Sequence, residues 1–436
     1  HNGPSLKEKV GAFLAGICVG LILLAFALFQ VPEIRDRVQW RIEIASAFLR
    51  GVIDPVKTLP TAVISSINAD QGETSVLLSN VSQAVPTMTE TQTPLPVSTL
   101  VATATVTPTP QPTYTPTLLP TSFKLVPPAY EKQDINNCGP ATLSMHLGYY
   151  GWQGNQKTIS SLIKPKQDDR NVNVEELVSY VNTEAAAYEI IYRVGGDIEL
   201  MKKLIAAGFP VTIEEAFHMQ ESYWFSDDRW AGHYLLLTGY DDASQVFISQ
   251  DVYVSPNLSV SYKTLDKNWQ AFNRVYVLIY PPEQRPQVQA ILGDQWDAKV
   301  NRQHALDFAK QETEKDSTDS FAWFNLGTNL VYFEKYSQAA NAYDNARGAG
   351  LPQRMLRYQF GPFFAYFNTG RIEDLLLLTD YALKRTPNSE EAMLWRAWGM
   401  YRQGDKTEAE KLFLRALNAK PGYTDAQYGL DFVRNN

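Results

Sequence analysis

Cys138 is the residue of this chain whose type and setting most favour chemistry. It lies in the stretch Gln133–Gly151, QDINNCGPATLSMHLGYYG, and the other of the two cysteines, Cys18, lies in an apolar N-terminal segment. Apolar residues recur at helical spacing after Gly139 and Pro140, and Pro is tolerated in the first turn of a helix because its missing N–H needs no partner there. We therefore predict a helix that begins at Cys138. The free N–H groups and the dipole of that helix end lower a thiol pKa, which makes Cys138 a candidate nucleophile.

A cysteine nucleophile needs an imidazole within hydrogen-bonding reach, and the positions of the five histidines separate them. His1 is terminal, and His304 lies in a C-terminal helical region. His146 lies about 12 Å along the predicted helix from the thiol, so we expect it to be a packing residue. His218 follows a strand and enters a polar, aromatic loop. His233 begins the apolar strand HYLLLTGY, and it is our candidate base; the alternative is a strand-end histidine bonded to the backbone.

Two further residues complete a candidate site. A turn at residues 241–244 joins the His233 strand to a second strand that leads to Asp251. Antiparallel pairing would return Asp251 to the beginning of the first strand, where it could orient His233. An oxyanion that develops on a substrate carbonyl needs hydrogen-bond donors. The backbone N–H of Cys138 is one candidate donor, and the side-chain amide of Gln133 is the second.

The region around these residues, 124–285, shows helical periodicity first and strand periodicity afterwards. Helices are expected over residues 174–181 and 198–207, and strands over 209–213, 233–240, 245–248 and 274–280. Helices followed by strands indicate an α+β domain with an antiparallel sheet.

The N-terminal third predicts an anchor and a linker. Val10–Phe29 is a run of 20 residues without a charge, which is long enough for a membrane-spanning helix, so residues 1–32 are interpreted as a tail and transmembrane anchor. Residues 33–123 are expected to form a juxtamembrane helix and then a linker. Residues 87–122 hold 13 Thr and 7 Pro, a composition typical of an extended spacer outside the cell. We therefore expect a single-pass protein of the cell membrane with its catalytic domain outside the cytoplasm.

Residues 295–436 show an internal repeat of about 34 residues. Ala382 and Ala416 are 34 residues apart, as are Pro387 and Pro421. The first copy carries small and aromatic residues at the spacing of a tetratricopeptide repeat, at Trp323, Leu326, Gly327, Ala339, Tyr343 and Ala346. The middle copy departs from the pattern, with Phe363 where a small residue is usual. This spacing resembles tetratricopeptide repeats and implies an all-α solenoid, for which partner or substrate binding is an analogy.

Composition excludes several classes of function. The net charge of −8 argues against nucleic-acid binding, which needs basic surface. Two cysteines exclude a disulfide framework. No cluster of His, Cys and carboxylates has the spacing of metal ligands, and we expect neither a metal nor another cofactor.

The candidate site residues together resemble the papain-like cysteine peptidases related to the bacteriocin-processing, double-glycine leader peptidases. The matching pieces are Gln133 upstream of NNCGPATLSMHLGYYG, GHYLLLTGYDD with His233, and QDVY with Asp251, within residues 124–285. In that family the Cys is the nucleophile, the His is the base, an Asp or Asn orients it, and the Gln donates to the oxyanion. The resemblance implies these roles for Cys138, His233, Asp251 and Gln133.

The leading hypothesis is a membrane-anchored cysteine peptidase whose repeats bind a substrate or a partner. The leader peptidases are fused to a transporter and an ATPase, and this chain has no GxxxxGK[ST] phosphate-binding sequence; cleavage after a double glycine is therefore not carried over. Two alternatives remain. One is a catalytically silent papain-like scaffold that binds peptides, and the other is an acyl transferase or amidase that uses the same three residues.

Overall fold

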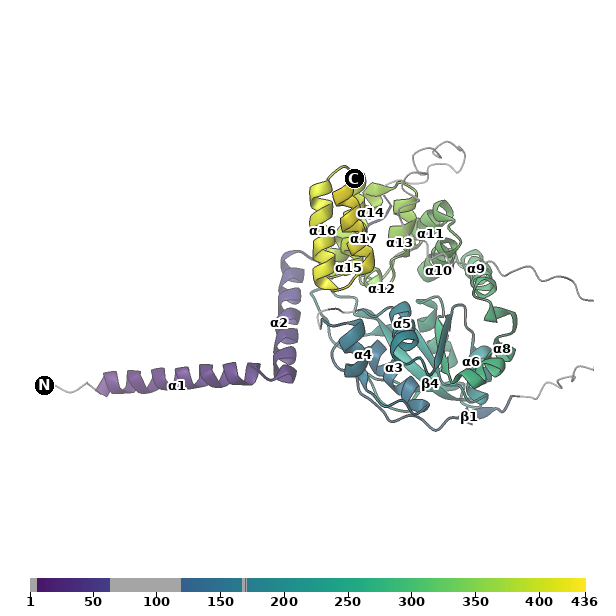
Figure 1. Ribbon diagram of the computed structural model, residues 1–436, viewed down its shortest axis with the longest axis horizontal. Helices are drawn as coiled ribbons and strands as arrows, with labels where there is room; N and C mark the ends of the chain where they lie inside the picture. The colour runs from purple at the N-terminus through teal and green to yellow at the C-terminus, as the bar shows by residue number, and fades with distance from the viewer. Residues whose placement is uncertain (1–5, 63–118, 167–168, 170) are drawn as a thin grey trace, which may run out of the picture.

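The structure is a computed structural model that describes residues 6–62, 119–166, 169 and 171–436. It has an N-terminal helical arm, a domain built on a seven-stranded sheet, and a C-terminal group of helices that packs against this domain (Figure 1). A sheet-containing domain followed by a helical region agrees with the fold class expected from the sequence.

The helices of the sheet domain begin and end at residues with suitable chemistry. The helix predicted at Cys138 is α3 (Cys138–Tyr149), and Gly151 follows it with a φ of 91°, a left-handed conformation that glycine adopts without strain. The N-cap side chains of two further helices accept backbone hydrogen bonds, Asn155 at α4 (Gln156–Ile163) and Asp197 at α6 (Ile198–Ala206). The remaining helices of the domain are α5 (Val174–Glu184), α7 (Tyr262–Gln270) and α8 (Arg285–Leu292).

The sheet is antiparallel throughout, with the order β2-β7-β3-β4-β5-β6 and with β1 paired to β4. The four predicted strands are β3 (Val211–His218), β4 (Trp230–Asp241), β5 (Val246–Gln250) and β7 (Tyr276–Tyr280). Three short strands were not predicted, namely β1 (Ser122–Lys124), β2 (Glu189–Arg193) and β6 (Leu258–Ser261). Their half-exposed burial patterns explain why the apolar pattern of the sequence was too weak to find them.

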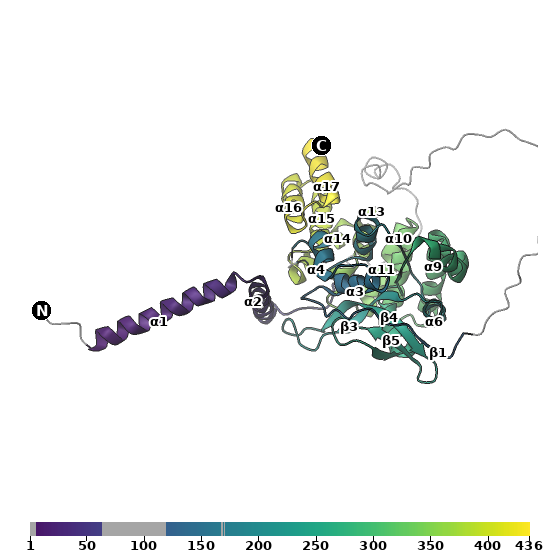
Figure 2. The ribbon, with the colours of Figure 1, turned by 60° about the horizontal axis from the view of Figure 1, so that its bottom comes forward.

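Both faces of the central strands are covered, so β4 is apolar on both sides. On one face, Leu236 packs with Ala141 and Met145 of α3. On the other, Leu235 and Leu237 belong to a cluster with side chains of α6, α7 and α8. Successive side chains of a strand point to opposite faces. Because both faces of β4 are buried, its residues form the uninterrupted apolar run YLLL. In Figure 2, α3 lies above β3, β4 and β5, and the C-terminal helices lie above both.

Most helices of the C-terminal region pack against the helix that precedes them in the chain. Their bounds are α9 (Ala298–Lys315), α10 (Ser320–Tyr332), α11 (Tyr336–Ala349), α12 (Met355–Tyr358), α13 (Gly361–Asn368), α14 (Ile372–Arg385), α15 (Glu390–Arg402), α16 (Lys406–Ala419) and α17 (Thr424–Asn435). Gly327 shows why the repeat needs small residues, since a Cβ at this position would lie 2.7 Å from the Tyr343 ring. Phe363, the departure in the middle copy, is fully buried in the shortened helix α13.

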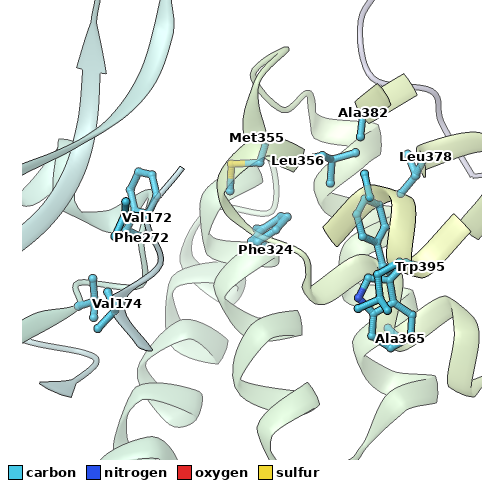
Figure 3. Packing of buried hydrophobic residues seen from close by; sticks show 14 of the residues in the cluster. Val172, Val174, Phe272, Phe324, Met355, Leu356, Ala365, Leu378, Ala382 and Trp395 are labelled. Atoms are coloured by element: carbon cyan, nitrogen blue, oxygen red, sulfur yellow. The ribbon is translucent and has the colours of Figure 1, made fainter. Parts of the chain in front are cut away.

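The helical repeats and the sheet domain share one hydrophobic core. Figure 3 shows Val172 and Phe272 of the sheet domain facing Phe324 and Met355 of the repeats, all in one cluster of buried side chains. Polar contacts reinforce this interface: buried Arg354 donates to the Trp230 carbonyl (2.8 Å) and pairs with Asp227 (2.5 Å). The repeats are therefore packed as part of the globular body and are not suspended from it by a flexible linker.

The N-terminal arm consists of α1 (Leu6–Phe29) and α2 (Pro32–Ile53), and α1 extends away from the rest of the molecule (Figure 1). Within the residues that the structure describes, no helix meets the combined length and hydropathy of a membrane span. The structure thus gives no support to the transmembrane helix that the apolar run predicted.

Helix α2 and the residues after it dock on the globular body. The rings of Trp40 and Tyr223 lie 5.5 Å apart between centroids, so α2 contacts the loop between β3 and β4. Farther along, the buried Arg347 of α11 donates to the carbonyls of Pro60 and Thr61, each at 2.7 Å. The sequence had suggested that a linker would separate the helical arm from the catalytic domain, whereas residues 54–61 here lie directly on the repeats. The rest of that linker, residues 63–118, lies outside the described residues.

Leu59 should contribute measurably to this docking. It is 4% exposed and belongs to the shared core, and truncation of a buried leucine to alanine costs about 2–5 kcal/mol. We expect Leu59→Ala to lower the free energy of unfolding in urea by an amount in this range. The matched control is Ile53→Ala, since Ile53 is 75% exposed and its loss should cost less than about 0.5 kcal/mol. Equal effects of the two substitutions would contradict the docked position.

Candidate active site

Cys138 is the first residue of α3, so its backbone N–H has no partner within the helix. Asn136, two residues earlier, has a φ of 54°, a left-handed conformation for which Asn is favoured over most residues. Gly139 follows because the chain comes close there: a Cβ on it would lie 3.3 Å from the Val172 Cβ. The thiol is thus held at the positive end of a buried helix.

His233 lies between Cys138 and Asp251. Its Nε2 is 2.9 Å from Asp251 Oδ1, and both residues are 4% exposed. The same imidazole acts on the Cys138 thiol, whose pKa it lowers. The rings of Phe217 and Tyr253 lie 5.2 and 6.4 Å from the imidazole centroid and restrict its rotation.

Asp251 follows β5 and is fixed by the turn that it begins. Its Oδ1 accepts hydrogen bonds from the backbone N–H groups of Tyr253 (2.8 Å) and Val254 (3.0 Å) as well as from His233. Its carbonyl accepts a hydrogen bond from the Tyr130 hydroxyl at 2.9 Å. Burial opposes ionisation, but the hydrogen bond and the charge of His233 outweigh it, and the pKa of Asp251 is lowered. The carboxylate is therefore ionised and points at the imidazole.

The electrostatics favour a thiolate paired with an imidazolium. Burial acts to raise the pKa of Cys138, yet the hydrogen bond and charge of His233, with the backbone N–H of Tyr234 and the charge of Lys164, lower it below the ordinary value. Burial acts in the opposite sense on His233, and the hydrogen bonds to Asp251 and Cys138 raise its pKa to about 10. The negative charge of the thiolate and the positive charge of the imidazolium stabilise each other, and the two pKa values move apart as a result.

Gln133 lies beside these residues because its backbone N–H donates to the Val252 carbonyl at 2.9 Å, directly after Asp251. Within the described residues its side-chain Nε2 has one contact, a 3.5 Å approach to the Asp134 carbonyl. Such a long contact is weak, so the amide is available to a ligand. The structure thus brings all four predicted residues, Gln133, Cys138, His233 and Asp251, to one place.

A set of buried polar residues that the sequence analysis missed holds the loop before Cys138. The Gln156 side chain, 4% exposed, accepts from the Asp134 N–H and the Asn137 amide, each at 2.7 Å, and donates to the Lys132 carbonyl at 2.8 Å. The carboxylate of Glu131 accepts from the Gln156 N–H at 3.1 Å. No sequence signal links residues 131–137 to Gln156, because the contact depends on how α4 folds back.

Three charged residues near the thiol were also missed. Lys164 is 6% exposed, its Nζ donates to the Asn136 carbonyl at 2.6 Å, and its charge lowers the pKa of Cys138. Glu214 and Glu215 are buried in β3, and Glu215 is the cross-strand partner of His233. Two adjacent carboxylates within the strand VTIEEAF are unusual in a buried strand, and this pattern was a signal that could have identified them.

The other described histidines of the domain lie outside the site. His146 is fully buried, its Nδ1 is 2.9 Å from Thr212 Oγ1, and burial lowers its pKa to about 3, which agrees with its expected packing role. His218 ends β3, opposite Trp230. Among the described residues, no group of three or more His, Cys, Asp or Glu side chains is arranged to hold a metal ion.

Residues 124–279 match the Peptidase_C39 like family. Solved structures to which the chain is similar include one described as a C39-like peptidase from Bacillus anthracis, with 16% identity over 36% of this chain and 96% of that chain and a TM-score of 0.30. Another is the peptidase domain of Streptococcus ComA, a bifunctional ABC transporter (16% identity, 35% and 96% coverage, TM-score 0.27). A third is YrrB, a TPR protein with an unusual peptide-binding site (18% identity, 40% and 81% coverage, TM-score 0.28). No curated protein matches the chain.

Proposed function

We propose, from the C39-like domain at residues 124–279 and the geometry within it, that this protein is a cysteine peptidase that hydrolyses peptide bonds. The observation that carries the proposal is the buried His233, which is hydrogen-bonded to Asp251 and lowers the pKa of Cys138 at a helix N-terminus. This arrangement is the one that activates a thiol nucleophile.

The residues then have the following roles. The Cys138 thiolate attacks the carbonyl carbon of the scissile peptide bond, and the carbonyl oxygen takes up the negative charge. The Cys138 backbone N–H and the Gln133 amide donate hydrogen bonds to that oxygen. The His233 imidazolium protonates the leaving amine, which departs and leaves a thioester on Cys138. His233, now neutral, takes a proton from water, which attacks the thioester and releases the acid.

The proposal is tested by incubating the full chain with a mixed peptide library and identifying the cleaved bonds by mass spectrometry. Hydrolysis gives new carboxyl and amino termini. When a primary amine is added in excess, an acyl transferase would instead give amide products, so the same assay separates the two chemistries. Absence of any product with wild-type protein, together with slow alkylation of Cys138 at neutral pH, would favour a catalytically silent scaffold.

Gln133→Ala should lower kcat without a comparable loss of thiol reactivity. Removal of one oxyanion donor costs about 10²–10³ in kcat, whereas the Cys138–His233 pair does not involve the Gln133 amide. The measurements are peptide hydrolysis and the rate of alkylation by iodoacetamide. Gln153→Ala is the matched control, since Gln153 is an exposed glutamine beyond α3. A kcat within threefold of wild type would remove Gln133 from the mechanism.

Attachment of the chain to the cell membrane, with the peptidase domain outside the cytoplasm, is a separate part of the proposal. Its support is the series of large apolar side chains exposed on α1 from Phe13 to Leu28, which is unusual for a surface in water. The full chain should stay with the membrane fraction after alkaline carbonate extraction, and a chain without residues 1–31 should be released. Protease accessibility of the domain on intact cells reports sidedness. Release of the full chain by carbonate would contradict the proposal.

A further inference from the structure

A cavity of about 720 Å³ lies between the sheet domain and the repeats. Its walls come from the beginning of α5, the end of β2, the middle of β3, the residues around Phe272, and helices α9, α10, α12, α13, α15 and α17. Three of its lining residues, Val174, Phe272 and Trp395, appear in Figure 3, which shows that they come from both parts of the molecule. A volume of this size is typical of a ligand site.

Aromatic rings form much of the cavity wall. Both parts of the molecule contribute them, Tyr192 and Phe272 from the sheet domain and Tyr358, Trp395, Trp398 and Tyr428 from the repeats. The faces of such rings carry negative potential and attract cations. The wall therefore favours an apolar or cationic occupant over an anionic one.

The charged groups of the wall give the same preference. Five carboxylates line the cavity, those of Glu175, Glu176, Glu214, Glu391 and Asp425, against two cations, Arg302 and Lys420. Both cations are already engaged: Lys420 pairs with Glu176, and Arg302 lies 4.8 Å above the Tyr332 ring and donates to Asn329. Glu176 is neutralised by Lys420, and burial raises the pKa of both Glu214 and Glu391. The negative charge of the wall therefore comes mainly from Glu175 and Asp425, and a bound cation would favour ionisation of Glu214 as well.

Glu214 connects the cavity to the catalytic residues. It is 8% exposed in β3, opposite Tyr234, whose backbone N–H helps to lower the pKa of Cys138. Burial and the charge of Cys138 raise the pKa of Glu214, and the charged groups acting on it most strongly, Cys138, Glu175 and His233, include no Lys or Arg. A cation bound beside Glu214 would relieve this repulsion between Glu214 and Cys138.

We propose that this cavity binds a basic segment of the peptide substrate, with a Lys or Arg side chain placed among the aromatic rings and the carboxylates of Glu214 and Glu175. The inference rests on the proposed peptidase function, because only a peptidase would cleave near the basic residues that the cavity binds. It goes beyond that function by assigning the substrate class and by giving the repeats a direct part in the specificity site.

The first experiment compares peptides that differ only in one charge. Matched fluorescent peptides carry lysine or norleucine at each position around the scissile bond, and kcat/KM is measured with the full chain. We expect one or more positions at which lysine is favoured by about 10- to 100-fold, the range for a desolvated cation held by rings and carboxylates. The preference is expressed as kcat/KM for the lysine peptide divided by kcat/KM for the norleucine peptide, so a general loss of activity does not affect it. This ratio should be smaller in Glu175→Gln and in Glu214→Gln than in the wild-type protein. Glu334→Gln, an exposed carboxylate at the turn between α10 and α11, is the matched control and should leave the ratio unchanged.

A second experiment separates failure of this inference from failure of the proposed function. Binding of the same peptides to full-length Cys138→Ala is measured by fluorescence anisotropy. Preferential binding of lysine peptides to this variant, together with no hydrolysis of any peptide by the wild-type protein, would retain the basic-segment site and reject the peptidase. Hydrolysis with equal kcat/KM for lysine and norleucine peptides, and equal binding of both, would overturn the inference and leave the peptidase standing.

Discussion

Replacement of Cys138 by alanine is expected to reduce peptide hydrolysis by about 10⁴- to 10⁶-fold, the range observed when the nucleophile of a catalytic triad is removed. The thiolate is the only group of the site that forms a bond to the substrate in the proposed mechanism. The remaining donors would still bind substrate, so KM should change far less than kcat. The measurement is single-substrate kinetics on a peptide identified from the library.

The control for this substitution is Cys18→Ala, which removes the other cysteine of the chain without touching the site. Its kcat should match that of the wild-type protein. Urea unfolding of Cys138→Ala should stay close to wild type, because a partly buried sulfur is lost without an unpaired charge. Hydrolysis by Cys138→Ala within tenfold of wild type would reject the thiol mechanism outright.

Replacement of His233 by alanine should have the second largest effect, and it should act on the thiol itself as well as on turnover. The imidazolium is the main group that lowers the pKa of Cys138, against a burial that acts to raise it. Without the imidazole, burial dominates and the sulfur becomes a neutral thiol at neutral pH. We expect iodoacetamide alkylation of Cys138 near pH 7 to slow by about 10- to 100-fold, and kcat to fall by about 10⁴-fold or more.

The pH dependence of the wild-type protein follows from the signs of the two shifts. The pKa of Cys138 is lowered and that of His233 is raised to about 10, so the thiolate–imidazolium pair exists between them. Activity should rise as pH increases through the lowered thiol pKa and fall as pH increases through the raised imidazolium pKa, giving a broad bell. The two limbs belong to the coupled pair and not to either residue alone.

His218→Ala is the matched control for the histidine substitution, since His218 ends β3 outside the site. It should leave both the alkylation rate and the pH profile unchanged. If His233→Ala retained rapid alkylation at pH 6 to 7, a different group would have to stabilise the thiolate, and Lys164 would be the first to test, since its charge also lowers the pKa of Cys138.

The central part of the site could be predicted from the sequence because its signals are local. Helical spacing after a Gly-Pro pair indicated that Cys138 begins a helix, and the turn at residues 241–244 indicated that Asp251 returns to His233. The structure has both features, with the imidazole and the carboxylate 2.9 Å apart. A hairpin fixes its pairing through short-range geometry, which is why residues 18 positions apart could be placed together without a structure.

Groups that support the site from a distance could not be predicted in the same way. Gln156 and Lys164 stabilise the loop before Cys138 through contacts that depend on how α4 packs. Gly232 carried a signal, as the residue before His233, but its reason is long-range. A Cβ there would lie 2.7 Å from the Phe272 ring and 3.0 Å from the Tyr358 ring, and Tyr358 belongs to the repeats.

The sequence by itself indicated four of the seven strands, the helix at Cys138, the α+β character of the first domain, the helical repeats, and the four residues of the candidate site named above. These follow from periodicity, helix-end chemistry and turn geometry, which act over a few residues. Only the tertiary structure decided that residues 54–61 dock on Arg347, that the repeats share a core with the sheet domain, and that an acidic, aromatic cavity forms between them. Such contacts join residues more than a hundred positions apart, and they are fixed by shape and burial between surfaces that no local pattern records.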